Sequence, residues 1–277
     1  MKNRRWFLII IMLGGLWRCT EIPPQINPID IDPGTGETQP RSVLVEEYTG
    51  VRCVNCPAGS EALQALINIY GDRLAVVSFH AGFFAPPYPE SKFDLRTNAG
   101  NNLLGFLGEP LGYPAAVVNR RLFMGEQRIQ LGQSQWPGYI AQEIAVPPPV
   151  EIDLQRKYDA ATRQLSLTVR LKVLQTVDTE DVRLSVALTE DNIQDVQLTP
   201  AGRQADYVHK HVLRDMITNF DGNLLTEGLR AGSELSRTYN YTLSPNWRAE
   251  QCKVIAFVNI GGSRKDVLQV QQTPVVE

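Results

Sequence analysis

The stretch VEEYTGVRCVNCPAG, residues 45–59, decides how the rest of the sequence is interpreted. It begins as a β-rich run, breaks at Gly50 and then carries two cysteines three positions apart. A segment with apolar residues at helical spacing follows. Cys53 and Cys56 are therefore expected in a turn between a strand and a helix. Such a pair can exchange disulfides, form a permanent structural disulfide, or supply half of a metal site.

The flanking segments predict a β-α-β unit. Residues 42–50 have the composition of a strand, residues 57–73 that of a helix, and residues 74–82 that of a strand buried on both faces. This order implies two parallel strands joined by a right-handed crossover.

A second kind of pattern begins after VPPP, residues 146–149, because three prolines cannot continue a helix or enter a central strand. Beyond it the chain consists of alternating runs, such as QLSLTVRLKVL (164–174) and CKVIAFVNI (252–260), with turn residues between them. This pattern predicts an antiparallel immunoglobulin-like β-sandwich over residues 149–277. The predicted boundary lies near residue 148.

The first residues predict export. A basic start precedes an apolar core that is too short to span a bilayer, which is typical of a secretory signal over residues 1–18. Cys19 follows where a lipoprotein signal peptidase leaves a cysteine for acylation, although Arg18 replaces the usual small residue; a plain signal peptide is the alternative. Residues 19–41 are rich in Pro, Gly and polar residues and are expected to form a flexible tether.

Charge and cysteine content narrow the class of protein. Without residues 1–18, which contain four basic and no acidic residues, 23 Lys and Arg stand against 30 Asp and Glu, a net charge of −7. This acidic balance with no basic stripe argues against nucleic acid as a partner. With Cys19 assigned to lipid, three cysteines remain and only one close pair exists. Disulfides persist outside the cytoplasm, so a single C-x-x-C disulfide is expected.

The position of the pair favours redox chemistry. A helix N-terminus stabilises a thiolate, and Arg52 adds a positive charge beside Cys53. Cys53 would attack and Cys56 would resolve the mixed disulfide. Pro57 suits the first helical position, which would start the helix after Cys56 and weaken the dipole effect at Cys53.

Strand, C-x-x-C, helix, strand and a later Gly-x-Pro before a strand together resemble thioredoxin. The resemblance implies a carboxylate buried beneath the disulfide at Glu47, six positions before Cys53, which would shuttle a proton to Cys56 if burial raises its pKa. An exposed ion pair with Arg52 is the alternative for Glu47. Pro114 matches the cis-proline that presents backbone to the substrate. The chain departs from thioredoxin at Arg52, where an aromatic is usual, and in a longer insertion before Pro114.

Four segments together resemble the outer-membrane-protein-28-related lipoproteins of Bacteroidetes-type bacteria: VEEYTGVRCVNCPAG, VVSFHAG, GYPAAVVNR and YVHKHVLRD. The resemblance covers residues 42–260. It implies a protein held in the outer membrane by a lipid anchor and facing the periplasm or the cell surface. That family is described mainly as surface lipoproteins, sometimes as adhesins, and implies no particular substrate.

The remaining metal-ligand residues are His80, His209, His211 and Cys252. They lie far along the chain and partly in the predicted second domain, so no metal site is predicted, because zinc needs four good ligands. His80 ends a buried strand and either faces the cysteines or is a structural residue. His209 and His211 alternate on one strand face, which is more typical of a solvated surface than of a metal pair. Cys252 is expected to be a buried free thiol.

The sequence thus predicts a thioredoxin-like α/β domain at residues 42–148, followed by an immunoglobulin-like sandwich. The predicted function is thiol–disulfide exchange on exported proteins by Cys53 and Cys56, with Pro114 shaping the substrate groove. No cofactor is expected, because the electrons travel through the cysteines. The alternatives are a non-enzymatic surface binding protein or adhesin, or an accessory subunit of an outer-membrane assembly, with a structural disulfide in either case.

Overall fold

Residues 39–277 are described by the computed structural model, so the predicted signal peptide, Cys19 and most of the predicted tether lie outside the described residues. Within the described range the helices are α1 (Cys56–Tyr70), α2 (Asn98–Leu107) and α3 (Trp136–Ile144). The strands before residue 148 are β1 (Val43–Thr49), β2 (Leu74–His80), β3 (Ala115–Val118) and β4 (Leu131–Gly132). The later strands are β5 (Val150–Asp159), β6 (Gln164–Val173), β7 (Val182–Glu190), β8 (Ile193–Thr199), β9 (Gly202–His209), β10 (Val212–Met216), β11 (Asn223–Leu224), β12 (Glu234–Thr242), β13 (Cys252–Ile260) and β14 (Val267–Pro274).

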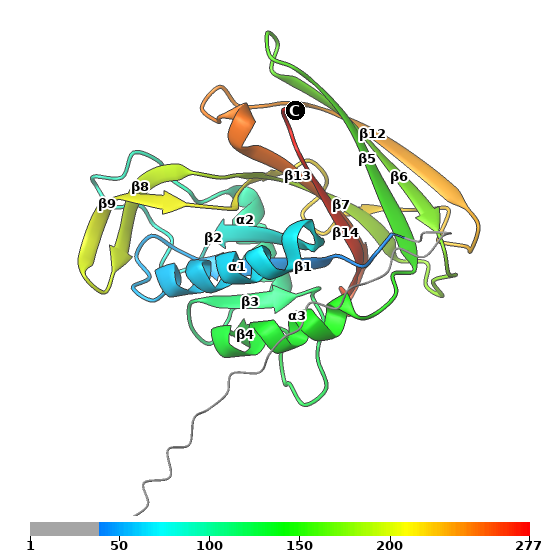
Figure 1. Cartoon of the computed structure of the whole chain (residues 1–277), viewed down its shortest axis with the longest axis horizontal. Helices are drawn as coiled ribbons and strands as arrows, with labels where there is room; N and C mark the ends of the chain where they lie inside the picture. The colour runs from blue at the N-terminus through cyan, green and yellow to red at the C-terminus, as the bar shows by residue number, and fades with distance from the viewer. Residues whose placement is uncertain (1–38) are drawn as a thin grey trace, which may run out of the picture. The chain divides into compact units, whose positions relative to one another are not determined.

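One mixed sheet of nine strands organises the described chain (Figure 1). Its order is β14-β13-β7-β10-β2-β1-β3-β4, and β11 pairs with β7. The predicted β-α-β unit is present, since β1 and β2 are parallel neighbours joined by α1. Strands β12, β6 and β5 form a separate sheet, and β8 and β9 form a two-stranded hairpin.

The predicted fold class is wrong. The described residues are mainly β-sheet with three short helices, and strands from both sides of residue 148 share the nine-stranded sheet. The link is β10, which pairs with β2 on one side and with β7 on the other. An α/β thioredoxin-like domain followed by an immunoglobulin-like sandwich would keep the two sets of strands apart. Alternation shows which face of a strand is buried, but not which strand edge lies beside it.

The nine-stranded sheet is covered on both faces. Beneath α1 and α3, side chains such as Val45, Leu63 and Trp136 form one core. On the opposite face, α2 packs on β1, β2, β7 and β13, as Leu103 and Phe257 illustrate. A third core fills the space between β7, β13 and the three-stranded sheet. Side chains point alternately to the two faces of a strand, so the residues of β1 and β2 that share the face of Val45 lie under α1.

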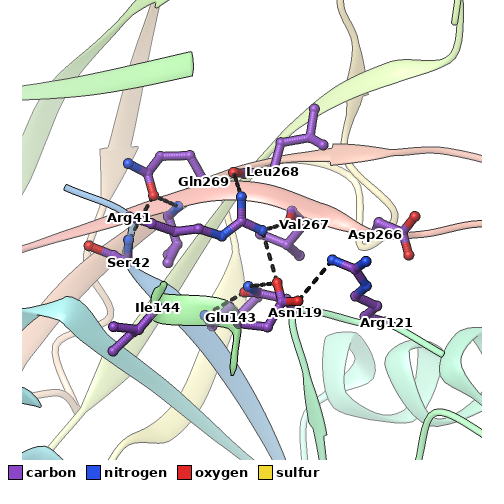
Figure 2. Close-up of polar contacts among 12 residues, drawn as sticks. Arg41, Ser42, Asn119, Arg121, Glu143, Ile144, Asp266, Val267, Leu268 and Gln269 are labelled. Carbon is purple, nitrogen blue, oxygen red and sulfur yellow. Dashed lines mark hydrogen bonds and ion pairs between the residues drawn. The ribbon is translucent and has the colours of Figure 1, made fainter. Parts of the chain in front are cut away.

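A buried ionic cluster ties the start of the described chain to its end (Figure 2). The Glu143 carboxylate, on α3, accepts hydrogen bonds from Arg41, Asn119 and Arg121 at 2.8–3.0 Å. Arg41 also donates to two backbone carbonyls of β14. Arg41 belongs to the last part of the predicted tether, yet it is buried and paired.

Candidate functional site at the Cys53–Cys56 disulfide

A disulfide joins Cys53 in the turn after β1 to Cys56, the first residue of α1. The helix therefore begins one residue earlier than the sequence predicts, with Pro57 in its first turn. This places Cys56, rather than Cys53, at the positive end of the helix dipole. Both cysteines are buried, with exposed fractions of 2% and 1%.

The β8–β9 hairpin, from the later part of the chain, covers this turn. Gln197 Nε2 donates hydrogen bonds to the carbonyl oxygens of Cys53 at 2.9 Å and Gly50 at 3.3 Å. The backbone N–H of Leu198 donates to the Val51 carbonyl at 2.8 Å. The sequence carries no signal for this contact, because the partners are almost 150 positions apart.

The insertion after β2 also packs against the turn. The backbone N–H of Arg52 donates to the Phe84 carbonyl, and its guanidinium donates to the Pro86 and Pro87 carbonyls. The same guanidinium lies 4.8 Å from the ring centroid of Tyr88. Arg52 is thus held against the Phe84–Tyr88 segment of the insertion that follows β2. It forms no ion pair with Glu47.

Glu47 lies on the face of β1 that α1 covers, and it is buried. The Ser78 hydroxyl donates to its Oε2 at 2.6 Å, while Oε1 has no hydrogen-bond partner among the described residues. Burial raises the pKa of Glu47 to about 7, against the opposing effect of the Ser78 hydroxyl. A Cβ on Gly59 would lie 3.1 Å from Oε1. Gly59 shares a helix face with Cys56, three residues before it, so the carboxyl lies just beneath the first turn of α1.

Pro114 lies against the same turn of the helix. The Tyr113–Pro114 peptide bond is cis, and a Cβ on Gly59 would lie 2.7 Å from Pro114 Cβ. An open groove of about 640 Å³ runs beside it, lined by residues 110–115 and by parts of 125–135. The structure thus brings Glu47, Pro114 and the disulfide together around the start of α1.

Two histidines from different sheets, His80 and His209, lie side by side. His80 ends β2 and His209 ends β9, and their ring centroids are 5.4 Å apart. Both line a small cavity together with Cys56. Burial holds the pKa of His80 well below its ordinary value and lowers the pKa of His209 to about 4, so both rings are neutral at pH 7. Only the folded β8–β9 hairpin brings them together.

The two other potential metal ligands, His211 and Cys252, lie apart from this site. His211 follows the end of β9, and its Nδ1 is 3.2 Å from the Asp191 carboxylate, so it does not share a strand face with His209. Cys252 is a buried free thiol, as predicted, in the core beneath the three-stranded sheet, and burial raises its pKa to about 12. Among the described residues, no helix is both long and apolar enough to cross a membrane.

These features define a mainly β protein with one large mixed sheet. A C-x-x-C disulfide lies at the end of strand β1 of this sheet, and the β8–β9 hairpin covers it. The family model described as Outer membrane protein Omp28 matches residues 109–277, which is more than half of the chain. The chain belongs to this outer membrane protein family, as its resemblance predicts. The matched range begins after the C-x-x-C turn, so the family match does not cover Cys53 and Cys56. No curated protein matches the chain.

Two solved structures share the fold over most of the chain. HBP35 of Porphyromonas gingivalis is 18% identical with a TM-score of 0.68, covering 86% of this chain and 76% of that chain. Protein AGR_C_4864 from Agrobacterium tumefaciens is 13% identical with a TM-score of 0.55, covering 87% of this chain and 97% of that chain. At these identities the likeness is one of fold alone. It extends over both sides of residue 148, in agreement with the shared sheet.

Proposed function

We propose that this outer membrane protein exchanges disulfides with exported proteins through Cys53 and Cys56. The observation that carries the proposal is the placement of the disulfide at the start of α1, above a buried carboxyl whose pKa is raised to about 7. A group with that pKa gives and takes a proton readily near neutral pH, which the resolving thiol of an exchange cycle needs.

In the oxidising direction, a substrate thiolate attacks Cys53 Sγ and the Cys53–Cys56 bond breaks. Cys56 leaves as a thiolate and takes a proton from the Glu47 carboxyl. A second substrate thiolate then attacks the mixed disulfide and releases Cys53 as a thiol after protonation. The substrate loses two electrons and the protein pair gains them; the reducing direction runs through the same steps in reverse. No other electron carrier takes part.

The groove beside Pro114 is the proposed binding site for the substrate polypeptide. Leu111 on its wall is 86% exposed, as is Phe83, whose ring centroid lies 5.2 Å from that of Phe84. The Phe84 ring in turn lies 5.3 Å from Tyr113, on the groove wall. An apolar rim of this kind suits an extended, partly unfolded polypeptide, which is the form in which an exported protein presents its cysteines.

Exchange requires the β8–β9 hairpin to open, because both cysteines are buried beneath it. Replacing Gln197 by alanine removes the side-chain donor to the Cys53 and Gly50 carbonyls. A hydrogen bond is worth about 1 kcal/mol, and about 1.4 kcal/mol is a factor of ten. Loss of one such bond corresponds to about a factor of five and loss of both to about a factor of thirty, so we expect Gln197→Ala to speed reduction of the disulfide by a dithiol about five- to thirtyfold. Gln194→Ala, at an exposed position of the same strand, is the matched control and should react like the wild type.

The second candidate is a surface binding protein in which the disulfide is only structural. The burial of both cysteines favours it, since an exchange centre needs an accessible sulfur. In this case Gln197→Ala would still speed reduction by a chemical dithiol, but Cys56→Ser would trap no exported protein.

Trapping separates the two functions. In cells that produce Cys56→Ser, Cys53 has no resolving partner, so mixed disulfides with exported proteins should accumulate and appear on non-reducing gels. The double variant Cys53→Ser/Cys56→Ser should trap nothing. Exchange is excluded if Cys56→Ser also traps nothing and the wild-type disulfide resists dithiols at about −120 to −270 mV, the range of exchange proteins.

We also propose that Cys19 carries the lipid that anchors the protein to the outer membrane. Acyl chains contribute about 0.8 kcal/mol per buried CH₂, so their loss should release the protein from membranes. Cys19→Ser is expected to abolish labelling by fatty acid and to move the chain to the soluble fraction. Cys252→Ser, at the buried free thiol, should change neither result. Membrane retention of an unlabelled Cys19→Ser chain would contradict the proposal.

A further inference from the structure

A small, partly open cavity lies under the start of α1, lined by Cys56, His80 and His209 among others. Its volume is about 10 Å³, which is room for a single small occupant such as one water molecule or one metal ion. Both ring nitrogens of His80, and Nε2 of His209, are buried with no hydrogen-bond partner among the described residues. Buried polar atoms are seldom left without a partner, so this cavity requires an explanation.

The two histidines are placed as ligands of one ion would be. Their ring centroids are 5.4 Å apart, with the ring planes inclined by 68°. With Zn–N bonds of about 2.0–2.1 Å, two imidazoles on a tetrahedral Zn²⁺ have their centroids roughly 5 Å apart. The centroid separation of His80 and His209 is therefore close to that of two imidazoles that share one ion.

The disulfide supplies the missing donors. Cys56 lines the cavity, and the sulfur of Cys53 is covalently bonded to that of Cys56. A C-x-x-C pair has the ligand spacing found in structural zinc sites. In the oxidised chain, residues 39–277 contain no group of three or more metal-ligand residues. Reduction frees two thiols, that of Cys56 at the cavity wall and that of Cys53, which in the disulfide lies one S–S bond away.

We propose that reduction of the Cys53–Cys56 disulfide creates a tetrahedral Zn²⁺ site made of these two thiolates and the imidazoles of His80 and His209. A dithiol supplies the two electrons and two protons and is itself oxidised to a disulfide, while the protein S–S bond becomes two thiols. Zn²⁺ then displaces both thiol protons into solvent. The site does not rest on the exchange function, because a chemical dithiol is sufficient to form it.

Charge balance supports this ligand set. Two thiolates neutralise the ion, and the two histidines enter as neutral imidazoles, so the ion and its four ligands together carry no net charge. Lys210 also lines the cavity, and its ammonium donates to Gln64 Oε1 at 2.9 Å. This arrangement also accounts for the ligands coming from three elements. The cysteines come from the turn before α1 and from its first residue, His80 from β2 and His209 from the β8–β9 hairpin, so a bound ion would fix the hairpin over the turn.

For the test, the purified chain is reduced with a dithiol, and the dithiol is then removed under anaerobic conditions. The reduced chain is titrated with Zn²⁺, or with Co²⁺ as a spectroscopic probe. We expect one ion per reduced chain, a thiolate-to-cobalt charge-transfer band, and no stoichiometric binding to the oxidised chain. His80→Gln and His209→Gln should each weaken binding by at least about 100-fold, since even residues that only support a ligand contribute 10- to 100-fold. His211→Gln, the remaining histidine, is the matched control and should bind like the wild type.

The proposal is overturned if the reduced wild-type chain binds no stoichiometric Zn²⁺, or if both variants at the cavity bind as tightly as the wild type. In the latter case the cysteines alone hold the ion. X-ray absorption of the Zn²⁺-loaded wild-type chain gives an independent result that needs no variant. Two sulfur and two nitrogen neighbours are expected, and any sulfur-only or oxygen-rich shell would contradict the site.

Discussion

Replacing Arg120 by methionine is expected to lower the free energy of unfolding by about 3–5 kcal/mol. Arg120 and Glu46 form a two-point ion pair, with nitrogen–oxygen distances of 2.6 and 2.7 Å and exposed side-chain fractions of 0% and 2%. The guanidinium also lies 4.8 Å from the ring centroid of Phe257. Removal of the cation leaves the Glu46 carboxylate buried without its partner, and that is the main source of the loss.

Denaturant unfolding with the disulfide intact measures this effect. Arg96→Met is the matched control, because Arg96 pairs with Asp94 at the surface, where both side chains are at least 40% exposed and such pairs contribute at most about 1 kcal/mol. The double variant Glu46→Leu/Arg120→Met should regain most of the stability, since no buried charge remains. If the single variant loses no more than Arg96→Met, the ion pair is not a major source of stability.

Local features of the fold could be predicted from the sequence. The β-α-β unit follows from apolar spacing within about 40 residues, and the disulfide follows from two cysteines three positions apart in an exported chain. Alternation along β1 also places Glu47 on the same face as Val45, toward the helix that follows. Each of these inferences depends on neighbours in the chain.

What the sequence does not indicate is contact between distant strands. An alternating strand can pair within a second sheet or extend the first one, and the pattern of β10 is the same in both cases. The coverage of the disulfide by β8 and β9, and with it the meeting of His80 and His209, depends on that choice. The expected second domain made these residues appear remote from Cys56, although they line one cavity with it.

The second large expected effect is the pH dependence that the Glu47 carboxyl gives to the free energy of unfolding. Burial raises its pKa from the ordinary value of 4.5 to about 7, so the native carboxyl holds its proton over a range in which the unfolded chain has lost it. Below about pH 4.5 both states are protonated and burial of the carboxyl carries no charge penalty. As pH rises toward 7 the penalty grows, and above 7 it is constant. The carboxyl therefore destabilises the folded chain at neutral and alkaline pH.

Glu47→Gln removes this penalty while keeping the size of the side chain. Relative to the wild type, the variant should gain about 3 kcal/mol of stability between pH 4.5 and pH 8, because each pKa unit corresponds to about 1.4 kcal/mol. Denaturant unfolding at pH 4.5, 6 and 8 measures the gain. Glu61→Gln, at an exposed position on α1, is the control and should stay within about 0.5 kcal/mol of the wild type at each pH. A gain for Glu47→Gln that does not grow with pH would show that the carboxyl is not held protonated by burial.

The same variant tests why a destabilising carboxyl lies under α1. Proton transfer by a positioned group contributes about 100-fold or more to a rate, so Glu47→Gln should slow disulfide exchange at pH 7 by about that factor if Glu47 serves Cys56. Its exchange rate should also lose the pH dependence that the wild type shows around pH 7. A variant that is more stable yet slower in exchange would mean that stability is given up for proton transfer. A variant that is more stable and equally fast would assign Glu47 no part in the exchange.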